Sequence, residues 1–328
     1  MGEMGENPMV SVIIPAYNVE KYIDACLQSV VSQTYTDLEI VFVDNCSTDS
    51  TLDKARKFAE QDPRIRIYSQ PVHGISETRN VGIDNATGEW VLFVDADDYI
   101  AENSVEVMLK KAAEDDVSVV LGMYRPLIDK SGKLKLVEAE EKVLRTKQEI
   151  AEYFFTDGRN FCHLWQKLCR REIFPKSPFV PGKKYEDIFF VPELIENAKG
   201  VSVINFPFYT YRVRPGSTVF DSNIETHFNG LEARLSGMEY IRGVFPDLFE
   251  PAGETVIEYC CYLLGTIVRE GRRANINFWN KTVDIFTETM NSLTLKGFRL
   301  KAAGAIFKVS PVLLGRLCRM YSYLKNRY

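Results

Sequence analysis

Apolar runs and amphipathic segments alternate along the first hundred residues. Runs rich in β-branched residues predict strands at 10–17, 38–45, 64–70 and 89–95. Apolar residues at helical spacing predict intervening helices over 23–31, 50–62 and 75–88, the last of them ended by Gly88. Strands that are apolar on both faces and separated by helices are typical of a parallel sheet with right-handed crossovers. The pattern therefore predicts an α/β fold.

Beyond residue 100 the pattern changes twice. Residues 117–215 hold two apolar stretches around the turn sequence DKSG at 129–132, which predict an antiparallel pair that completes the sheet. From about residue 220 only helical patterns remain, at 223–245, 253–270 and 276–291, with two short helices around Pro311. We expect one α/β domain over 1–218, with a ligand-binding half at 1–100 and a second half at 101–218, and a helical region over 219–328.

Polar residues gather where the predicted parallel strands end. They are Tyr17 and Asn18, the segment 44–49, and the aspartates of the segment 95–98. Ligands of open parallel sheets bind at the carboxyl ends of the strands. No glycine-rich phosphate loop occurs in the chain, so a phosphate ligand would need another source of positive charge.

The segment 95–98 carries three carboxylates, Asp95, Asp97 and Asp98, directly after a buried strand. Like charges this close repel each other unless water or a cation separates them. Asp95 and Asp97 lie two positions apart, so both point to the same side of an extended segment. Carboxylates together with substrate phosphates are how Mg²⁺ is usually held, and Mn²⁺ accepts the same oxygen ligands. The alternative is a solvated turn in which Asp98 caps the next helix.

Composition narrows the class of protein. The chain has 328 residues and is 45% hydrophobic, which is typical of a globular protein. Its formal net charge of -5 gives no indication of nucleic-acid binding, which needs an excess of basic residues. The amino-terminal segment has no apolar signal core, and the longest apolar run, 259–268, is too short to span a bilayer. The cysteines show no CxxC spacing and indicate reduced thiols. These features predict a cytoplasmic protein.

The last part of the chain, 296–328, is basic and amphipathic. No acidic residue follows Glu288, and Leu313, Leu317, Tyr321 and Leu324 share one helical face that Arg316 and Lys325 flank. This pattern suits the surface of an anionic membrane, which would make the protein peripheral on the inner face of the plasma membrane. An amphipathic helix packed on the protein itself gives the same pattern.

Taken together, the motifs resemble glycosyltransferase family 2 and its GT-A nucleotide-sugar domain. The resemblance is carried by VSVIIPAYNVEKYIDACLQSVVSQTYTDLEIVFVDNCSTDST, GISETRNVGIDNATGEWVLFVDADD, WQKLCRREIF and KYEDIFFVPELIENA, and it covers roughly residues 9–215. It is strongest toward bacterial members that build surface polysaccharides. A mostly parallel central sheet is implied.

The resemblance also implies roles for individual residues. Donor-binding positions are Pro15, Ala16, Tyr17, Asp44, Arg79 and Asp95, the metal ligand is Asp97, and the catalytic base is Asp187. Asn45 and Cys46 depart from the family pattern, which has Asp and Gly there. Cys46 suggests that the backbone at this position does not need a positive φ.

The implied reaction is a metal-dependent, inverting transfer of a sugar from a nucleotide-diphosphate donor, a UDP-sugar, to a hydroxyl of a growing glycan or lipid-linked saccharide. Mn²⁺ or Mg²⁺ is the implied cofactor. Two other classes fit parts of the pattern: a catalytically inactive sugar-nucleotide-binding protein, and a glycoside hydrolase with paired carboxylates. Single residues also have simpler interpretations, namely a strand-end turn for Asp44, a surface ion pair for Arg79 and a helix start for Asp187.

Overall fold

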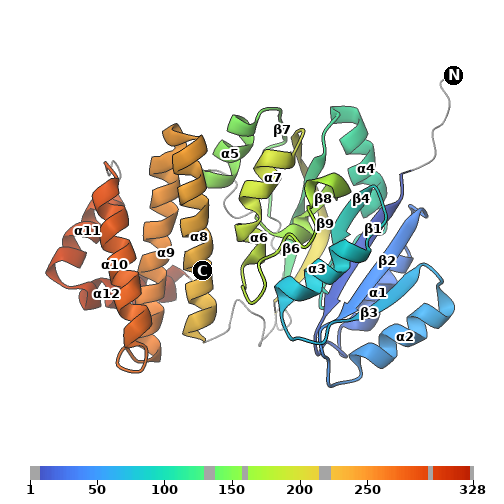
Figure 1. The fold of residues 1–328 in the computed structure, drawn as a ribbon, viewed down its shortest axis with the longest axis horizontal. Helices are drawn as coiled ribbons and strands as arrows, with labels where there is room; N and C mark the ends of the chain where they lie inside the picture. Colours follow the sequence, from blue (N-terminus) through green and yellow to red (C-terminus); the bar gives the residue numbers. More distant parts are fainter. Residues whose placement is uncertain (1–7, 129–136, 157–161, 214–222, 295–297, 326–328) are drawn as a thin grey trace. The chain divides into compact units, whose positions relative to one another are not determined.

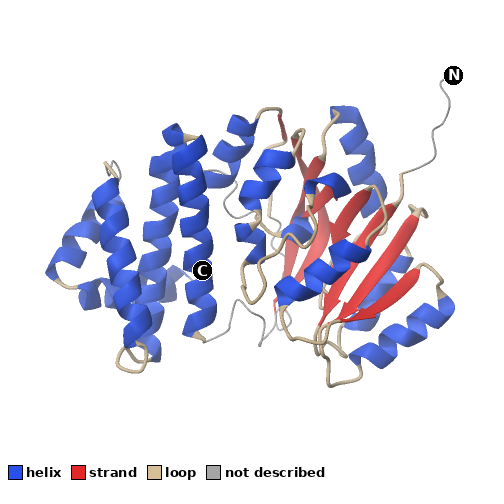
Figure 2. Ribbon diagram, in the orientation of Figure 1, coloured by secondary structure: helices blue, strands red, loops and turns tan. Residues whose placement is uncertain are grey.

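The computed structural model describes residues 8–128, 137–156, 162–213, 223–294 and 298–325. Its contacts divide the chain into two compact units, Met1–Ile150 with Asn160–Ser217, and Ala151–Arg159 with Thr218–Tyr328. Figures 1 and 2 show the first unit as strands with helices around them and the second as helices. Each unit is described by itself below.

A single nine-stranded sheet organises the first unit, in the order β3-β2-β1-β4-β8-β6-β9-β5, with β7 beside β9. The strands are β1 (Val10–Ala16), β2 (Leu38–Asp44), β3 (Ile65–Ser69), β4 (Trp90–Phe93), β5 (Tyr99–Ile100), β6 (Val119–Ile128), β7 (Lys142–Leu144), β8 (Lys167–Arg170) and β9 (Val201–Val213). Strands β1 to β4 pair in parallel, β6 and β9 also pair in parallel, and β4–β8, β6–β8, β5–β9 and β7–β9 are antiparallel.

Helices cover both faces of this sheet. They are α1 (Ile23–Val31), α2 (Thr51–Gln61), α3 (Ile75–Asn85), α4 (Ser104–Asp115), α6 (Glu186–Phe189) and α7 (Val191–Asn197). Every residue of β1 and β2 is buried. Val12 and Ile14 share a core cluster with residues of α1 and α4, whereas Ile13 on the opposite face packs against Gly82 of α3. Burial on both faces explains why these strands are apolar without alternation, and the prediction of a mostly parallel sheet is confirmed.

Gly88 has a different role from the predicted one. Helix α3 ends at Asn85, and the N–H of Gly88 donates to Ser11 Oγ at 2.9 Å and to the buried carboxylate of Glu39 at 3.0 Å. A Cβ at Gly88 would lie 2.7 Å from the backbone N of Ser11. The glycine is therefore required by the close approach of this loop to β1 and not by the helix end.

Residues 129–136, which include the turn DKSG, lie outside the described residues. One backbone hydrogen bond, from Val137 N to Tyr124 O at 3.2 Å, links the two sides of this segment. In the described residues β6 pairs antiparallel with β8 and parallel with β9. Of the predicted antiparallel partner after the turn, 133–141, the first four residues lie outside the described residues, and 137–141 form no strand.

The second unit consists of helices. They are α8 (Ile224–Val244), α9 (Phe249–Glu270), α10 (Ile276–Ser292), α11 (Phe298–Val309) and α12 (Pro311–Lys325), while α5 (Lys147–Phe155) begins in the first unit and ends in the second. Helix α12 packs on α9, with Leu314 buried and Gly315 against the backbone of Leu264. The predicted helical runs are all present, and Pro311 starts α12 at a position where its missing N–H costs nothing.

Candidate functional site

The carboxyl ends of β1 and β2 meet at the first part of the site. Ala16 pairs with Asp44 in the parallel ladder, and Asn45 N donates to Ala16 O at 2.8 Å. Pro15, Ala16 and Asp44 are buried. The Asp44 carboxylate accepts from Ser47 N at 3.3 Å, so Asp44 does form the strand-end turn. Asp44 is also buried at the edge of the sheet where ligands of parallel sheets bind, and its role in donor binding stays a prediction.

The loop that follows β2 corrects one expectation. Cys46 has a φ of 60°, in the left-handed region that favours glycine, so the backbone there does need a positive φ. The Cys46 thiol lies 2.9 Å from Gln70 O and anchors the loop to the end of β3. Asn45 is buried and its Oδ1 accepts from Gly74 N at 3.0 Å, which ties the same loop to the start of α3. Both departures from the family pattern therefore hold this loop in place.

Tyr17 and His73 form an exposed aromatic pair beside these loops. Their ring centroids lie 4.2 Å apart with the planes inclined by 51°. Tyr17 is 45% exposed although it is a large aromatic residue. An aromatic surface left open at the ends of parallel strands is suited to stacking against a planar ring.

The three aspartates of the segment 95–98 do not act as one group. Asp95 and Asp97 are partly exposed, whereas Asp98 is buried, and its carboxylate accepts from Tyr209 Oη at 2.9 Å and from Arg212 N at 2.7 Å. Burial, together with the charges of Asp97 and Asp95, raises the pKa of Asp98 to about 9. Asp98 therefore packs the segment against β9 and caps no helix, and two carboxylates remain on the open side.

Arg79 connects the segment 95–98 to the Glu186–Asp187 segment. Its guanidinium donates to Asp95 Oδ1 at 2.9 Å and forms a second ion pair with Glu186. The Arg79 side chain is only 6% exposed, and so is that of Glu186. Arg79 is therefore a buried bridge between two carboxylates and not a surface ion-pair residue. The raised pKa of Asp95, which partial burial causes, is opposed by the charge of Arg79.

Asp187 lies at the start of α6, as predicted, and its side chain contacts His163. Asp187 Oδ2 lies 3.0 Å from His163 Nδ1, and Asp187 Oδ1 accepts from Ile188 N at 2.8 Å. Burial raises the pKa of Asp187. The hydrogen bond and charge of His163 and the charge of Arg79 lower it by more, so that the pKa of Asp187 is about 2. Asp187 is thus ionised and held by its neighbours.

Three further residues of this site were not among the site residues that the resemblance implied. Glu186 is buried against Arg79, His163 stacks on Trp165 with a centroid distance of 4.9 Å, and Lys167 is 2% exposed with its Nζ donating to His163 O at 2.6 Å. Burial lowers the pKa of Lys167 to about 8. The sequence signal that could have identified them is that Lys167 and Glu186 lie within the motifs WQKLCRREIF and KYEDIFFVPELIENA, and that His163 lies two positions before the first of these.

A family comparison explains why these parts occur together. The model for "Glycosyl transferase family 2" matches residues 11–177, which is about half of the chain and includes β1 to β4 with their loops. The chain belongs to glycosyl transferase family 2. Among curated family-2 relatives, the glycosyltransferase GlyA of Streptococcus pneumoniae is 33% identical over 215 residues. That match covers 63% of this chain and 31% of GlyA, so the chain spans about a third of this relative.

Solved structures show the same fold. TarS 1-349 of S. aureus, in complex with UDP-GlcNAc, has a TM-score of 0.63 at 21% identity and covers 98% of this chain and 93% of its own. The mannosyltransferase PcManGT of Pyrobaculum calidifontis, in complex with GDP-Man and Mn2+, has a TM-score of 0.52 at 18% identity and covers 98% of this chain and 88% of its own. The GT-A-like architecture of the first unit is therefore shared with glycosyltransferases.

Membership of family 2 raises the question of a metal. Asp95 and Asp97 alternate with the buried residues Ala96 and Asp98, so both carboxylates lie on the open side of the segment. In the part of the chain that the structure describes, no group of three or more His, Cys, Asp or Glu side chains could hold a metal alone. Mg²⁺ and Mn²⁺ accept few protein carboxylates and complete their shell with phosphate oxygens and water. The two aspartates fit an ion of this kind.

None of the described helices combines the length and the apolar character that a membrane crossing requires.

Proposed function

We propose that the protein is a glycosyltransferase that moves a sugar from a UDP-sugar to a hydroxyl of a growing glycan. The observation that carries this proposal is the buried Arg79 bridge, with its two ion pairs to Asp95 and Glu186. It joins the end of β4 to the start of α6, ninety-one positions apart in sequence, so that Asp95 and the neighbour of Asp187 belong to one site. The family match and the UDP-GlcNAc complex of TarS support the donor class.

Donor binding is assigned to the loops that follow β1 and β2. We infer that Tyr17 and His73 stack on the nucleobase, because they are the paired rings left open there. Pro15 and Ala16 form the floor beside them, and Asp44 accepts from the base or ribose. Arg79 holds Asp95 in place with a hydrogen bond of 2.9 Å and serves the donor site through this contact.

We assign the chemical step to the carboxylates of Asp97 and Asp187. Asp97, with Asp95 beside it, would hold Mn²⁺ or Mg²⁺, and the ion would neutralise the departing diphosphate. In an inverting displacement the acceptor hydroxyl approaches the sugar from the face away from the diphosphate. The ionised Asp187 and its partner His163 come from two segments other than the one that holds Asp95 and Asp97, and both are assigned to that acceptor face. We assign to Asp187 the role of the base that receives the proton of the hydroxyl, with His163 hydrogen-bonded to it.

The test of this function is UDP release from a panel of UDP-sugars with and without Mn²⁺, combined with calorimetric titration of UDP. Metal-dependent release from at least one donor is expected, and Asp97→Ala should lose it. A wild-type protein that binds UDP with metal but releases none in the presence of any tested saccharide acceptor would be a sugar-nucleotide-binding protein. One that binds no UDP at all would contradict the proposal entirely.

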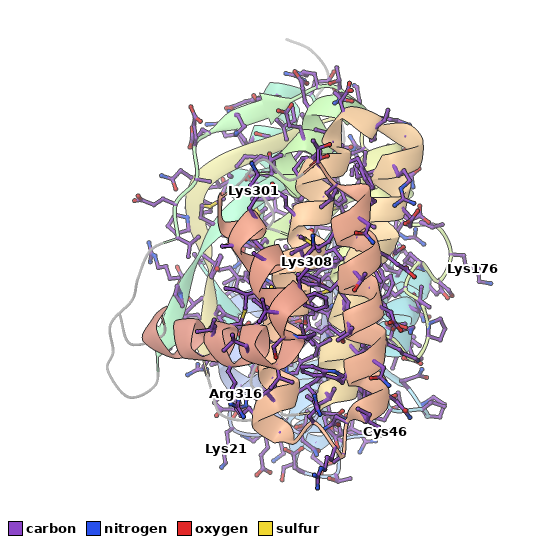
Figure 3. All side chains as sticks on the ribbon, turned by 90° about the vertical axis from the view of Figure 1, so that its left-hand side faces the viewer. Lys21, Cys46, Lys176, Lys301, Lys308 and Arg316 are labelled. Atoms are coloured by element: carbon purple, nitrogen blue, oxygen red, sulfur yellow. The ribbon has the colours of Figure 1, made fainter. Side chains whose placement is uncertain are left out.

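A second part of the proposal concerns contact with a membrane that carries the acceptor. The basic corner, which we define as Lys301, Lys308, Val309, Leu313 and Arg316, lies on α11 and α12. Val309 is 81% exposed and Leu313 is 44% exposed, while the three basic residues are also exposed. Figure 3 shows Lys301, Lys308 and Arg316 on the side of these helices that faces the viewer. Apolar side chains flanked by cations suit an anionic membrane surface.

Only part of the predicted apolar face of α12 is exposed in the described residues. Leu313 is exposed, but Leu317 is half-buried and the neighbouring Leu314 is buried against the helical unit. Side chains at Tyr321 and Leu324 lie outside the described residues. We therefore place membrane contact at the basic corner, and we propose that it brings the enzyme to lipid-linked acceptors on the inner face of the plasma membrane.

Co-sedimentation with phosphatidylglycerol vesicles tests the basic corner. Each basic residue near such a surface contributes about 1 kcal/mol, so the variant with Lys308→Glu and Arg316→Glu should lose most of its binding at low salt. Lys176→Glu together with Lys57→Glu gives the same change of net charge at exposed positions of the first unit and is the matched control. Equal loss in both variants, or no binding by the wild type, would contradict a membrane role for this corner.

A further inference from the structure

Two helices of the second unit approach each other closely at a glycine. Helix α12 packs on α9, and Gly315 of α12 lies against the backbone of Leu264 on α9. A Cβ at Gly315 would be 3.0 Å from Leu264 O and 3.2 Å from Val268 Cγ2. In a close-packed interior a larger residue at this position pushes the two helices apart. The glycine therefore sets a short distance between α9 and α12.

Two cysteines lie one helical turn away from this contact. Cys318 follows Gly315 by three positions on α12, and Cys261 precedes Leu264 by three positions on α9. Residues three apart share one face of a helix, so both thiols lie on the faces that the glycine brings together. The Cys261 thiol donates a hydrogen bond to the Cys318 sulfur. Two sulfur atoms are thus in direct contact across the helix interface.

Both thiols of this pair can react with a small solute. Cys261 and Cys318 are free and half-buried, whereas Cys260, adjacent in sequence, is buried and has a raised pKa because of that burial. The hydrogen bond from Cys261 lowers the pKa of Cys318, and the same bond raises that of Cys261. The thiolate is the nucleophile of thiol chemistry. Cys318 is therefore the sulfur that reacts first, with Cys261 beside it as the second.

We propose that Cys318 and Cys261 are a site of reversible oxidation, at which hydrogen peroxide converts the two thiols into a disulfide between α12 and α9. The Cys318 thiolate attacks a peroxide oxygen, so that an S–O bond forms, the O–O bond breaks and hydroxide leaves. The sulfur of Cys261 then attacks the resulting sulfenic acid, so that the S–S bond forms, the S–O bond breaks and a second hydroxide leaves. The hydroxides take up the two thiol protons, and one peroxide is reduced to two water molecules.

The disulfide fastens α12 to the rest of its unit. A bond from Cys261 to Cys318 closes the chain segment that contains α10 and α11 into a loop, which restricts the unfolded state. Helix α12 also carries Leu313 and Arg316 of the basic corner, so oxidation holds this part of the corner on the unit. A reducing dithiol restores both cysteines by exchange. The inference does not depend on the proposed function.

Peptide mass spectrometry of the full chain tests this site. The protein is treated with hydrogen peroxide, the remaining thiols are alkylated, and linked peptides are identified before and after reduction. We expect a disulfide between Cys261 and Cys318, which Cys46→Ser in the first unit should leave unchanged. In Cys261→Ser the sulfenic acid at Cys318 should be trapped by dimedone. Absence of this disulfide at every peroxide concentration that leaves the protein folded, or a link between two chains in its place, would overturn the proposal.

Two glycine variants test the geometry that carries the inference. Gly315→Ala places a methyl group 3.0 Å from Leu264 O, so it should move the helices apart and lower the yield of the disulfide at a fixed time. Gly243→Ala on α8 is the matched control, because its Cβ would meet nothing within 4 Å. Equal yields in the two variants would contradict the role of the close approach.

Thermal unfolding shows whether the bond fastens α12. The oxidised wild type should unfold at a midpoint at least about 5 °C above that of the same protein after reduction. Cys318→Ser treated in the same way should show no such difference. An oxidised wild type that contains the disulfide and has an unchanged midpoint would overturn this effect of the bond.

Discussion

Replacing Arg79 by methionine removes the positive charge at the centre of the site and keeps a side chain of similar length. At 2.9 Å, the attraction between Arg79 and Asp95 is roughly 6 kcal/mol in a medium of effective dielectric about 20, before desolvation is subtracted. Breaking a buried ion pair by removing one partner costs about 3–5 kcal/mol, because the other charge stays buried. Glu186 is the residue left in that position, since its side chain is 6% exposed.

Urea unfolding followed by tryptophan fluorescence measures this cost. Trp90 and Trp165 lie in the first unit and Trp279 in the second, so a Trp279→Phe background restricts the signal to the unit that contains the site. In that background Arg79→Met should lower the free energy of unfolding by about 3–5 kcal/mol. Adding Glu186→Gln should restore about 2 kcal/mol of it, because the uncompensated carboxylate is then gone.

Two results would refute this reasoning. One is an Arg79→Met variant within about 1 kcal/mol of its background, which is the range of an exposed pair. The other is a double variant that is no more stable than Arg79→Met alone, since the loss would then come from the contact of the Arg79 guanidinium with the Phe93 ring. Phe93→Leu in the same background controls for that packing contact.

Three further outcomes are expected. Asp97→Ala should abolish the Mn²⁺-dependent part of UDP affinity in calorimetry, and an unchanged metal dependence would exclude Asp97 as a ligand. The pKa of Asp187, about 2 against an ordinary 3.8, stabilises the folded state fully above about pH 4, by roughly 2 kcal/mol, and this contribution is lost as pH falls toward 2. Asp187→Asn should therefore flatten the acid limb of the unfolding free energy, whereas parallel limbs would contradict the linkage. Gly88→Ala should destabilise by about 1–3 kcal/mol in thermal unfolding, because its Cβ would meet Ser11 N at 2.7 Å.

Local periodicity was enough for the first four strands of the sheet and for the helices of the second unit. Every residue of β1, β2 and β4 is buried, so a continuous apolar run of a few residues already identifies these strands. The same local information placed Tyr17, Asp44 and Asp95 at strand ends, where parallel topology brings them to one edge. Alternation along an extended segment likewise put Asp95 and Asp97 on the same side.

Contacts between distant segments were decided only by the tertiary structure. No pattern in the sequence pairs Arg79 with Glu186, or His163 with Asp187, because these contacts depend on how α3, α6 and β8 meet around the end of β4. In the sequence Asp98 resembles Asp95 and Asp97. In the structure it is buried and accepts a hydrogen bond from Tyr209, which lies 111 positions later. The positive φ of Cys46 came from the loop that the thiol and Asn45 anchor, and a side-chain preference at one position is too weak to oppose such anchoring. Sequence alone determined which chemistry gathers at the sheet edge, and only the fold determined which of those groups touch.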